Sequence, residues 1–313
     1  MKAFYLLIIG CFLFSCSEKS RDEVALVLDK KSDLGEGAVW NHKTGELIWV
    51  NIIGEIINFY NPGLNYNKEM FTGQMIGTAV PAESGYVMVA LGNGIYQFDP
   101  ETGTKKKVAD PEADISGNRF NDGKCDPAGR FWAGTMSMTG EEGAGTLYRL
   151  NSDGSIHPMV KGVSISNGIA WSADASRMYY IDTPTRKVME YDYDNATGEI
   201  RNPRVALHVP EGMGAPDGMT IDAGGNLWVA LWGGAAVGCW NPRSGELLRT
   251  IEVPAKNVTS CAFGGKDLDV LYITTARQGT SAEELKKYPH AGGLFKTRPG
   301  VKGMEAFFFK GEF

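Results

Sequence analysis

The segment Gly225-Asn226-Leu227-Trp228-Val229 is one copy of a short pattern that recurs along this 313-residue chain. Each copy has a turn residue followed by an apolar run with an aromatic residue near its middle. The copies recur at a period of roughly 45 residues, which is typical of propeller blades. The other five copies are Gly45–Val50, Gly85–Val89, Gly129–Ala133, Ser176–Tyr180 and Asp269–Ile273. Six copies predict six blades.

Further short strands and turns lie between the copies, as in Ile95–Gly103 and Val237–Gly245. Their Asp-Pro, Asn-Pro and Ser-Gly or Thr-Gly pairs are typical of turns, and helical periodicity is almost absent. Evenly spaced short strands predict an antiparallel all-β fold. We expect one all-β domain over residues 23–313, a six-bladed β-propeller. The segments Val24–Leu28 and Met304–Phe309 are strand-like, and we expect them to pair in one blade and close the ring.

The beginning of the chain has the pattern of an export signal. Lys2 is followed by the apolar run Ala3–Phe14, which is too short to span a bilayer, and the sequence turns polar after Cys16. Leu13–Cys16 resembles the lipobox of bacterial lipoproteins. We interpret residues 1–15 as a signal peptide, Cys16 as a lipidation site and residues 16–22 as a tether. The alternative is a plainly secreted protein whose cleavage site lies a little later. Both interpretations predict an exported protein of the periplasm or cell envelope, and in the first of them the N-terminal lipid is its one membrane attachment.

Composition excludes several classes of function. The net charge is −6 and the basic residues form no long run, so nucleic acid is not an expected partner. Cys125, Cys239 and Cys261 are odd in number and widely spaced, which indicates neither a disulfide framework nor a zinc knuckle. The chain has no Gly-x-Ser-x-Gly motif, so a covalent serine-hydrolase route is not expected. The oligomeric state is left open.

A second recurring unit, a polar residue followed by a small one, precedes the repeated aromatic residues. It reads Glu36-Gly37, Asp122-Gly123, Asn167-Gly168, Asp217-Gly218 and, more weakly, Ser260-Cys261. Equivalent positions of successive blades lie on a ring around the axis, so we expect these side chains to converge in the central channel. Asp-Gly and Asn-Gly pairs also form ordinary tight turns. That alternative does not explain Glu36, which is a poor turn former in the same place.

Buried carboxylates crowded into a channel are costly, by several kcal/mol for each unpaired charge. A cation at the centre resolves this cost. Oxygen ligands favour calcium, magnesium or manganese over zinc, and the four histidines lie outside the recurring unit; they are His42, His157, His208 and His290. The sequence therefore predicts a central metal-binding channel with one divalent ion.

Several motifs also follow one another in a characteristic order. They are Leu34–Gly37, Asn118–Lys124 with Asp126–Arg130 and Ala133–Met136, Ile165–Gly168, Pro216–Met219 and Thr259–Gly265. Through them the chain resembles the gluconolactonase and regucalcin (senescence marker protein) family over nearly all of its mature sequence. The resemblance implies hydrolysis of an aldono-1,4- or 1,5-lactone to the aldonic acid. Ala38, where many members have proline, and the loop at 141–145 leave the choice of lactone open.

The resemblance also assigns roles to individual residues. The implied metal ligands are Glu36, Asn167 and Asp217, and the implied substrate contacts are Arg119, Asn121 and either Glu141 or Glu142. Calcium is the expected ion, with zinc, magnesium and manganese as alternatives.

This site suggests a mechanism for opening an internal ester. The ion would polarise the lactone carbonyl, and Asp217 would accept a proton from water. Arg119 and Asn121 suit a sugar ring, although Arg119 could instead pair with Asp122. Two other functions stay open: an organophosphate or aryl-ester hydrolase on a calcium propeller, and a non-catalytic propeller that binds a sugar or a protein partner.

Overall fold

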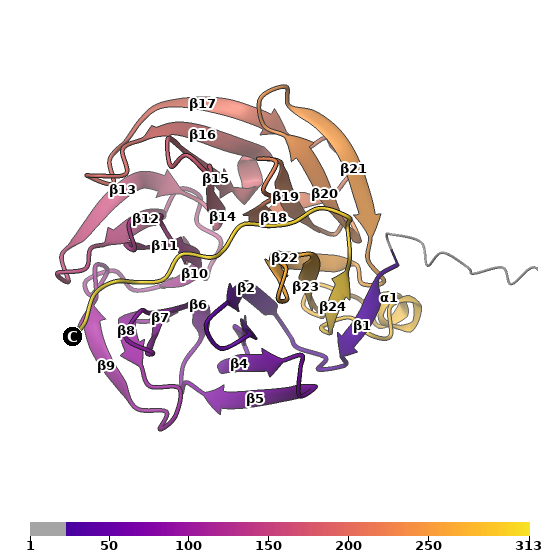
Figure 1. Ribbon diagram of the computed structural model, residues 1–313, viewed down its shortest axis with the longest axis horizontal. Coiled ribbons are helices and arrows are strands. Elements are labelled where there is room, and N and C mark those ends of the chain that lie inside the picture. Colours follow the sequence, from indigo (N-terminus) through magenta and orange to yellow (C-terminus); the bar gives the residue numbers. More distant parts are fainter. Residues whose placement is uncertain (1–22) are drawn as a thin grey trace, which may run out of the picture.

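A computed structural model describes residues 23–313, which form six four-stranded antiparallel sheets around a central axis (Figure 1). The first three blades, from the innermost strand outward, are β2 (Gly35–Asn41), β3 (Glu46–Asn51), β4 (Ile56–Asn61) and β5 (Tyr66–Phe71); β6 (Ile76–Pro81), β7 (Val87–Leu91), β8 (Gly94–Phe98) and β9 (Lys105–Ala109); and β10 (Asn118–Cys125), β11 (Phe131–Ser137), β12 (Gly145–Leu150) and β13 (Ile156–Val163). The expected six-bladed all-β propeller is confirmed.

The fourth to sixth blades continue around the ring. They are β14 (Ser166–Trp171), β15 (Arg177–Asp182), β16 (Lys187–Tyr193) and β17 (Ile200–His208); β18 (Ala215–Ile221), β19 (Leu227–Trp232), β20 (Ala236–Asn241) and β21 (Glu246–Glu252); and β22 (Asn257–Gly264), β23 (Val270–Ala276), β24 (Leu294–Thr297) and β1 (Ala25–Leu28). Two short helices occur among the described residues, η1 (Thr183–Thr185) and α1 (Ala282–Lys287).

The repeated aromatic pattern is the second strand of each blade. This strand lies between the innermost and third strands, and its two faces pack against the two neighbouring blades. Trp49, Trp132 and Trp228 are accordingly at most 1% exposed. Six apolar clusters each fill the space between two adjacent blades. A strand buried on both faces needs a nearly continuous apolar run, which is why the pattern is visible in the sequence.

The N-terminal strand closes the ring. β1 pairs antiparallel with β24 and is the outermost strand of the sixth blade. The expectation that a chain end closes a blade is confirmed, but the expected pairing with 304–309 was wrong. The C-terminal segment instead crosses one face of the disc (Figure 1), where Phe309 N donates to Pro81 O at 2.9 Å. Burial of Phe308 and Phe309 explains the apolar run that looked like a strand.

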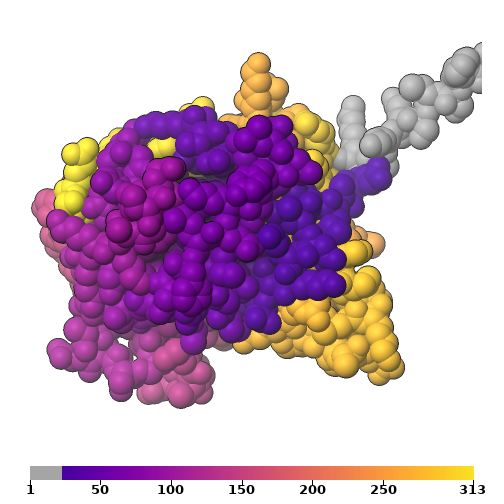
Figure 2. Space-filling model, turned by 90° about the horizontal axis from the view of Figure 1, so that it is seen from below, coloured from indigo at the N-terminus to yellow at the C-terminus, as the bar shows by residue number. Residues whose placement is uncertain are grey.

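The disc has two distinct faces. Figure 2 shows it from the edge: yellow atoms of the C-terminal segment and one orange loop lie at one face, and magenta and golden parts project beyond the other. We call the first the tail face, because residues 301–313 cover it, and the second the site face, because the innermost strands begin there. The expected signal peptide, Cys16 and tether lie outside the described residues. Among residues 23–313 no helix has the length and apolar character needed to cross a bilayer.

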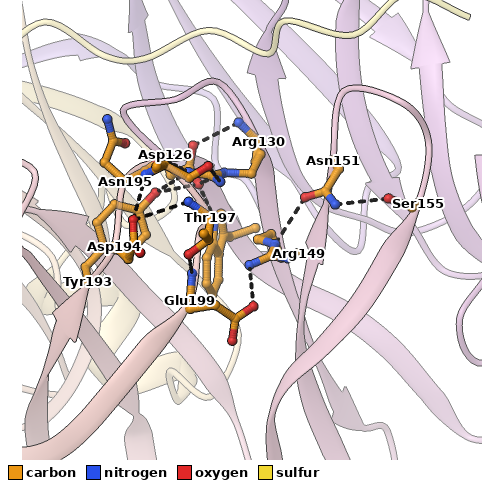
Figure 3. A network of polar contacts seen from close by, with 12 residues as sticks. Asp126, Arg130, Arg149, Asn151, Ser155, Tyr193, Asp194, Asn195, Thr197 and Glu199 are labelled. Atoms are coloured by element: carbon orange, nitrogen blue, oxygen red, sulfur yellow. Dashed lines mark hydrogen bonds and ion pairs between the residues drawn. The ribbon is translucent and has the colours of Figure 1, made fainter.

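A buried ionic network joins blades 3 and 4 at the tail face (Figure 3). Asp126, just after β10, accepts hydrogen bonds from Arg130 Nε at 2.6 Å, Trp132 Nε1 at 2.8 Å and Tyr193 OH at 2.7 Å. Tyr193 belongs to blade 4. The backbone N–H of Arg130 also donates to Asp126 Oδ1 at 2.9 Å. The Asp126 side chain has no exposed surface, so these protein donors stabilise its charge in place of water.

Replacing Asp126 with Ala should destabilise the protein by about 3–5 kcal/mol, because the change leaves the Arg130 charge buried without its partner. Equilibrium denaturation in urea measures this loss. The matched control is Asp192→Ala, which removes ion pairs to Arg177 and Arg204 at a 39% exposed side chain and should cost less than about 1 kcal/mol. Equal losses in the two variants would contradict the assigned role of Asp126.

Candidate functional site

The recurring polar residues lie near the beginning of the innermost strands. Glu36 is on β2, Asp122 on β10, Asn167 on β14 and Asp217 on β18. In all six innermost strands, the pairing with the second strand shifts register close to this position. Such a β-bulge inserts a residue and re-aims the side chains around it. The ring thus carries six bulges at one level, and the polar side chains converge there.

The glycines in the recurring unit allow the blades to approach one another closely. A Cβ atom on Gly168 would lie 2.7 Å from Asp217 O, and one on Gly218 would lie 2.8 Å from Thr259 O. Both distances are too short for a real side chain. The expected reason for glycine beside the axis is confirmed at these two positions.

Three of the predicted site residues meet in the channel. The Asp217 carboxyl lies close enough to the Glu36 carboxyl and to the Asn167 amide for both to influence its pKa. Glu36, Asn167 and Asp217 come from blades 1, 4 and 5 and are 4%, 5% and 5% exposed. The structure therefore brings together the three residues that the sequence expects to share an ion.

Burial and like charge dominate the electrostatics of this cluster. Burial raises the pKa of Glu36 well above its ordinary value, and the Asp217 and Asp122 charges raise it further. Burial, followed by the Asp122 charge, raises the pKa of Asp217 to about 8. Burial also raises the pKa of Asp122, against the opposing charge of Lys124. Without a cation, the cluster keeps protons at a pH where exposed carboxylates are ionised.

The donor atoms of the cluster fit a hard divalent ion. Asn167 Oδ1 and Asp122 Oδ2 are buried and have no hydrogen-bond partner, which is costly unless a cation satisfies them. Asn167 Nδ2 donates to Thr183 Oγ1 at 3.0 Å, which leaves the amide oxygen for another ligand. No group of three or more His, Cys, Asp and Glu side chains within residues 23–313 has a metal-binding arrangement. An ion here would therefore depend on the Asn167 oxygen as well as on carboxylates.

Arg119 and Asn121 lie beside the cluster at the beginning of β10. Arg119 Nη1 donates to Asn121 Oδ1 at 2.8 Å and to Phe120 O at 2.9 Å, and Asn121 Nδ2 donates to Ser166 O at 2.8 Å. The Asn121 amide thus bonds blade 4 and holds Arg119. No ion pair between Arg119 and Asp122 is found among the described residues. The Glu36 and Asp217 charges act on Arg119 instead.

The remaining predicted contacts are less defined. Glu141 and Glu142 are exposed in the turn between β11 and β12, and neither forms a hydrogen bond or ion pair within the described part of the chain. Their contact with substrate stays a prediction. Sequence reasoning missed Lys124, whose ammonium group donates to Met219 O inside the channel. Its place in the Asn118–Lys124 motif was visible, but its neighbours across the channel were not.

Comparisons with known proteins agree with this architecture. Residues 34–277 match the family model described as SMP-30/Gluconolactonase/LRE-like region. A Bacillus subtilis protein named "Putative sugar lactone lactonase YvrE" is 39% identical over 93% of this chain and 99% of its own, and regucalcin of Danio rerio is 39% identical over 92% and 99%. A luciferin-regenerating enzyme has a TM-score of 0.86 at 33% identity, covering 92% of this chain and 99% of its own. The structure of a calcium-binding protein, regucalcin, from Agrobacterium tumefaciens has a TM-score of 0.87 at 28% identity, covering 91% and 96%.

The raised carboxyl pKa values predict how stability depends on pH in the presence of a chelator. A group with a raised pKa in the folded state stabilises the fold only while protonated. The Glu36 and Asp217 contribution should therefore be lost between pH about 4, near the ordinary values, and pH about 8, the value for Asp217. Calorimetric Tm measurements should show Glu36→Gln gaining on the wild type across this range. Calcium should stabilise the wild type increasingly as pH rises; a constant Tm difference would contradict the assignment.

Proposed function

Because the chain belongs to the SMP-30/Gluconolactonase/LRE-like family, we propose that it is a metal-dependent hydrolase that opens a sugar lactone, an aldono-1,4- or 1,5-lactone, to the aldonic acid. The observation that carries this proposal is the convergence of Glu36, Asn167 and Asp217 from three blades, with an unpartnered amide oxygen among buried carboxyls. The name of the Bacillus relative supports the substrate class. The Agrobacterium regucalcin is a calcium-binding protein, which supports calcium as the ion; magnesium, manganese and zinc are alternatives for the same donors.

Hydrolysis of a lactone adds water across the ring ester. The oxygen of water bonds to the carbonyl carbon, the bond from that carbon to the ring oxygen breaks, and a proton passes from water to the released hydroxyl. A divalent ion held by Glu36, Asn167 and Asp217 would polarise the carbonyl and favour the ionised carboxylates. Asp217 would accept the water proton and return it to the departing ring oxygen, a role worth about 10²–10⁴ in rate.

Arg119 is the residue best placed to orient the sugar. Both described hydrogen bonds of its guanidinium use Nη1, so Nε and Nη2 remain for a substrate hydroxyl or the ring oxygen. The forked geometry and permanent charge of arginine suit such a contact. Asn121 already bonds Arg119 and Ser166, so in this proposal it positions Arg119 and contacts the sugar through its remaining donor and acceptor capacity.

The leader of the chain supports an exported enzyme. With residues 1–15 removed and Cys16 lipidated, the tether at 16–22 would hold the propeller at a membrane of the cell envelope. The partner in this proposal is a small sugar lactone and not a nucleic acid, since the acidic chain has no basic run.

Asp217→Asn tests the central assignment. The substitution preserves size, so the propeller should fold, while calcium binding weakens and lactone hydrolysis falls by about 100-fold or more. Acid release from aldonolactones, each with calcium, magnesium, manganese or zinc, measures the activity, and calorimetry measures ion binding. Asp153→Asn is the matched control, because Asp153 is exposed in a turn of blade 3. Full lactone turnover by Asp217→Asn would refute the mechanism.

The same assays separate lactone hydrolysis from the other functions that a calcium propeller can have. Turnover of diisopropyl fluorophosphate or an aryl ester without turnover of any lactone would replace the proposal with an organophosphate or aryl-ester hydrolase. Calcium-dependent thermal stability without turnover of any of these substrates would indicate a non-catalytic binding propeller.

Arg119→Lys should separate substrate binding from chemistry. Lysine keeps the charge but loses the fork, so KM for the preferred lactone should rise about tenfold while kcat changes less, as expected for loss of a hydrogen bond from a charged donor. Steady-state kinetics with saturating calcium measures both constants. A fall in kcat as large as that of Asp217→Asn, at unchanged KM, would contradict an orienting role.

A further inference from the structure

Lys124 reaches across the central channel. Its side chain starts on β10, and its ammonium group donates to the carbonyl of Met219 on β18. β10 belongs to blade 3 and β18 to blade 5, with blade 4 between them. Because these blades are not neighbours, a side chain that joins them must cross the space that the ring encloses. The hydrogen bond therefore places a positive charge in the channel itself.

This charge lies beneath the carboxyl cluster, on the side of the tail face. Pairing of β10 with β11 is unbroken from Asp122, opposite Gly134, to Lys124, opposite Trp132, so Asp122 and Lys124 point to the same side of the strand. Asp122 in turn faces Glu36 and Asp217. Lys124 is two residues further toward the tail face, where it lines an apolar cavity that residues 304–307 also line.

The charges around the cluster form a simple balance. Glu36, Asp122 and Asp217 supply three negative charges when ionised, and Arg119 and Lys124 supply two positive charges. Burial lowers the pKa of Lys124, and the Asp122 charge opposes this effect. With all three carboxyls ionised, as binding of a divalent ion favours, the protein groups together carry one net negative charge. A divalent ion changes the net charge to one positive, which the oxyanion developing on a lactone carbonyl would neutralise.

We propose that Lys124 is a positioning residue for the reaction, a fixed cation on the axis that leaves the ion-loaded site one positive charge in excess. This inference rests on the proposed lactone hydrolysis. The excess charge stabilises the developing oxyanion, because fixed charges act strongly in a buried site. The same excess weakens binding of the divalent ion, since like charges repel. Lys124 therefore lowers affinity for the ion and raises the rate of the reaction.

Lys124→Met tests these opposite effects, because methionine keeps much of the length and removes the charge. Calcium should bind on the order of tenfold more tightly, and kcat for the lactone should fall on the order of tenfold, as single charges at short range in a protein predict. Calorimetric titration with calcium measures the first effect and steady-state kinetics the second. In chelator, the Tm of Lys124→Met should fall, because Asp122 loses its counter-charge.

Two further variants provide the controls. Lys106→Met makes the same change at an exposed lysine of β9 and should leave Kd, kcat and Tm unchanged. The second control compares Asp122→Asn with the double variant Asp122→Asn and Lys124→Met. The double variant should still bind calcium more tightly than Asp122→Asn alone, because the Lys124 charge is removed in both backgrounds, and the four proteins form a double-mutant cycle.

The outcomes separate this inference from the proposed function. A wild type that binds no divalent ion and opens no lactone overturns both. A wild type that does both, with Lys124→Met binding calcium equally or more weakly, overturns the role of Lys124 alone. Opposite changes in calcium affinity and kcat support it, because loss of packing lowers both together.

Discussion

The repulsion between buried carboxyls on the axis is the constraint on which the rest of this structure depends. Glu36, Asp122 and Asp217 come from three blades. Burial raises the pKa of all three carboxyls, and neighbouring carboxylates raise the pKa of Glu36 and Asp217 further. Such a cluster tends to push its strands apart. It persists because each innermost strand is held by the ladder behind it, and because β1 and β24 close the ring. Stability elsewhere in the fold offsets the cost of the site.

Buried aspartates have different hydrogen-bond partners at the two faces of the disc. At the tail face, Asp126 and Asp222 each follow an innermost strand and accept a tryptophan Nε1 hydrogen bond, at 2.8 Å and 2.9 Å. Both carboxylate oxygens of Asp126 accept hydrogen bonds from protein donors. At the site face, Asp122 and Asn167 keep an unpartnered buried oxygen. The difference shows that the fold can satisfy a buried carboxylate, so the unsatisfied oxygens mark a place for a ligand.

The sequence predicted well which position of the repeat each residue occupies, but it predicted poorly which residues of other blades lie next to it. The aromatic copies became second strands because a strand buried on both faces must be apolar along its length. The polar units all lie on innermost strands, because each occupies the same position in its repeat. In blade 3, however, the register shift falls between Phe120 and Asp122, so Asn121, and not Asp122, is the inserted residue. A bulge depends on the pairing of two strands, and one strand's sequence does not reveal it.

The path of the C-terminal segment was missed for a related reason. Its run of three consecutive phenylalanines is as apolar as a buried strand, and burial against two blades requires the same residue types as pairing in a sheet. Likewise, the neighbours of Lys124 across the channel become visible only once the ring is closed. Periodicity gives the level of a residue along the axis, whereas charge balance depends on what faces it from the opposite blade.

Strand β10 contributes more charged residues to the site than any other innermost strand of the described chain. Blades 1 and 5 contribute Glu36 and Asp217 to the cluster, while β10 carries Arg119, Asp122 and Lys124 within six residues. Its two cations flank its own anion, one toward each face of the disc. Changes on the other blades alter the donors available to an ion, but changes on β10 alter the net charge that both ion and substrate meet. Because the ring keeps these blades at fixed distances, one strand can adjust the electrostatics of the site without moving any of the residues that would hold the ion.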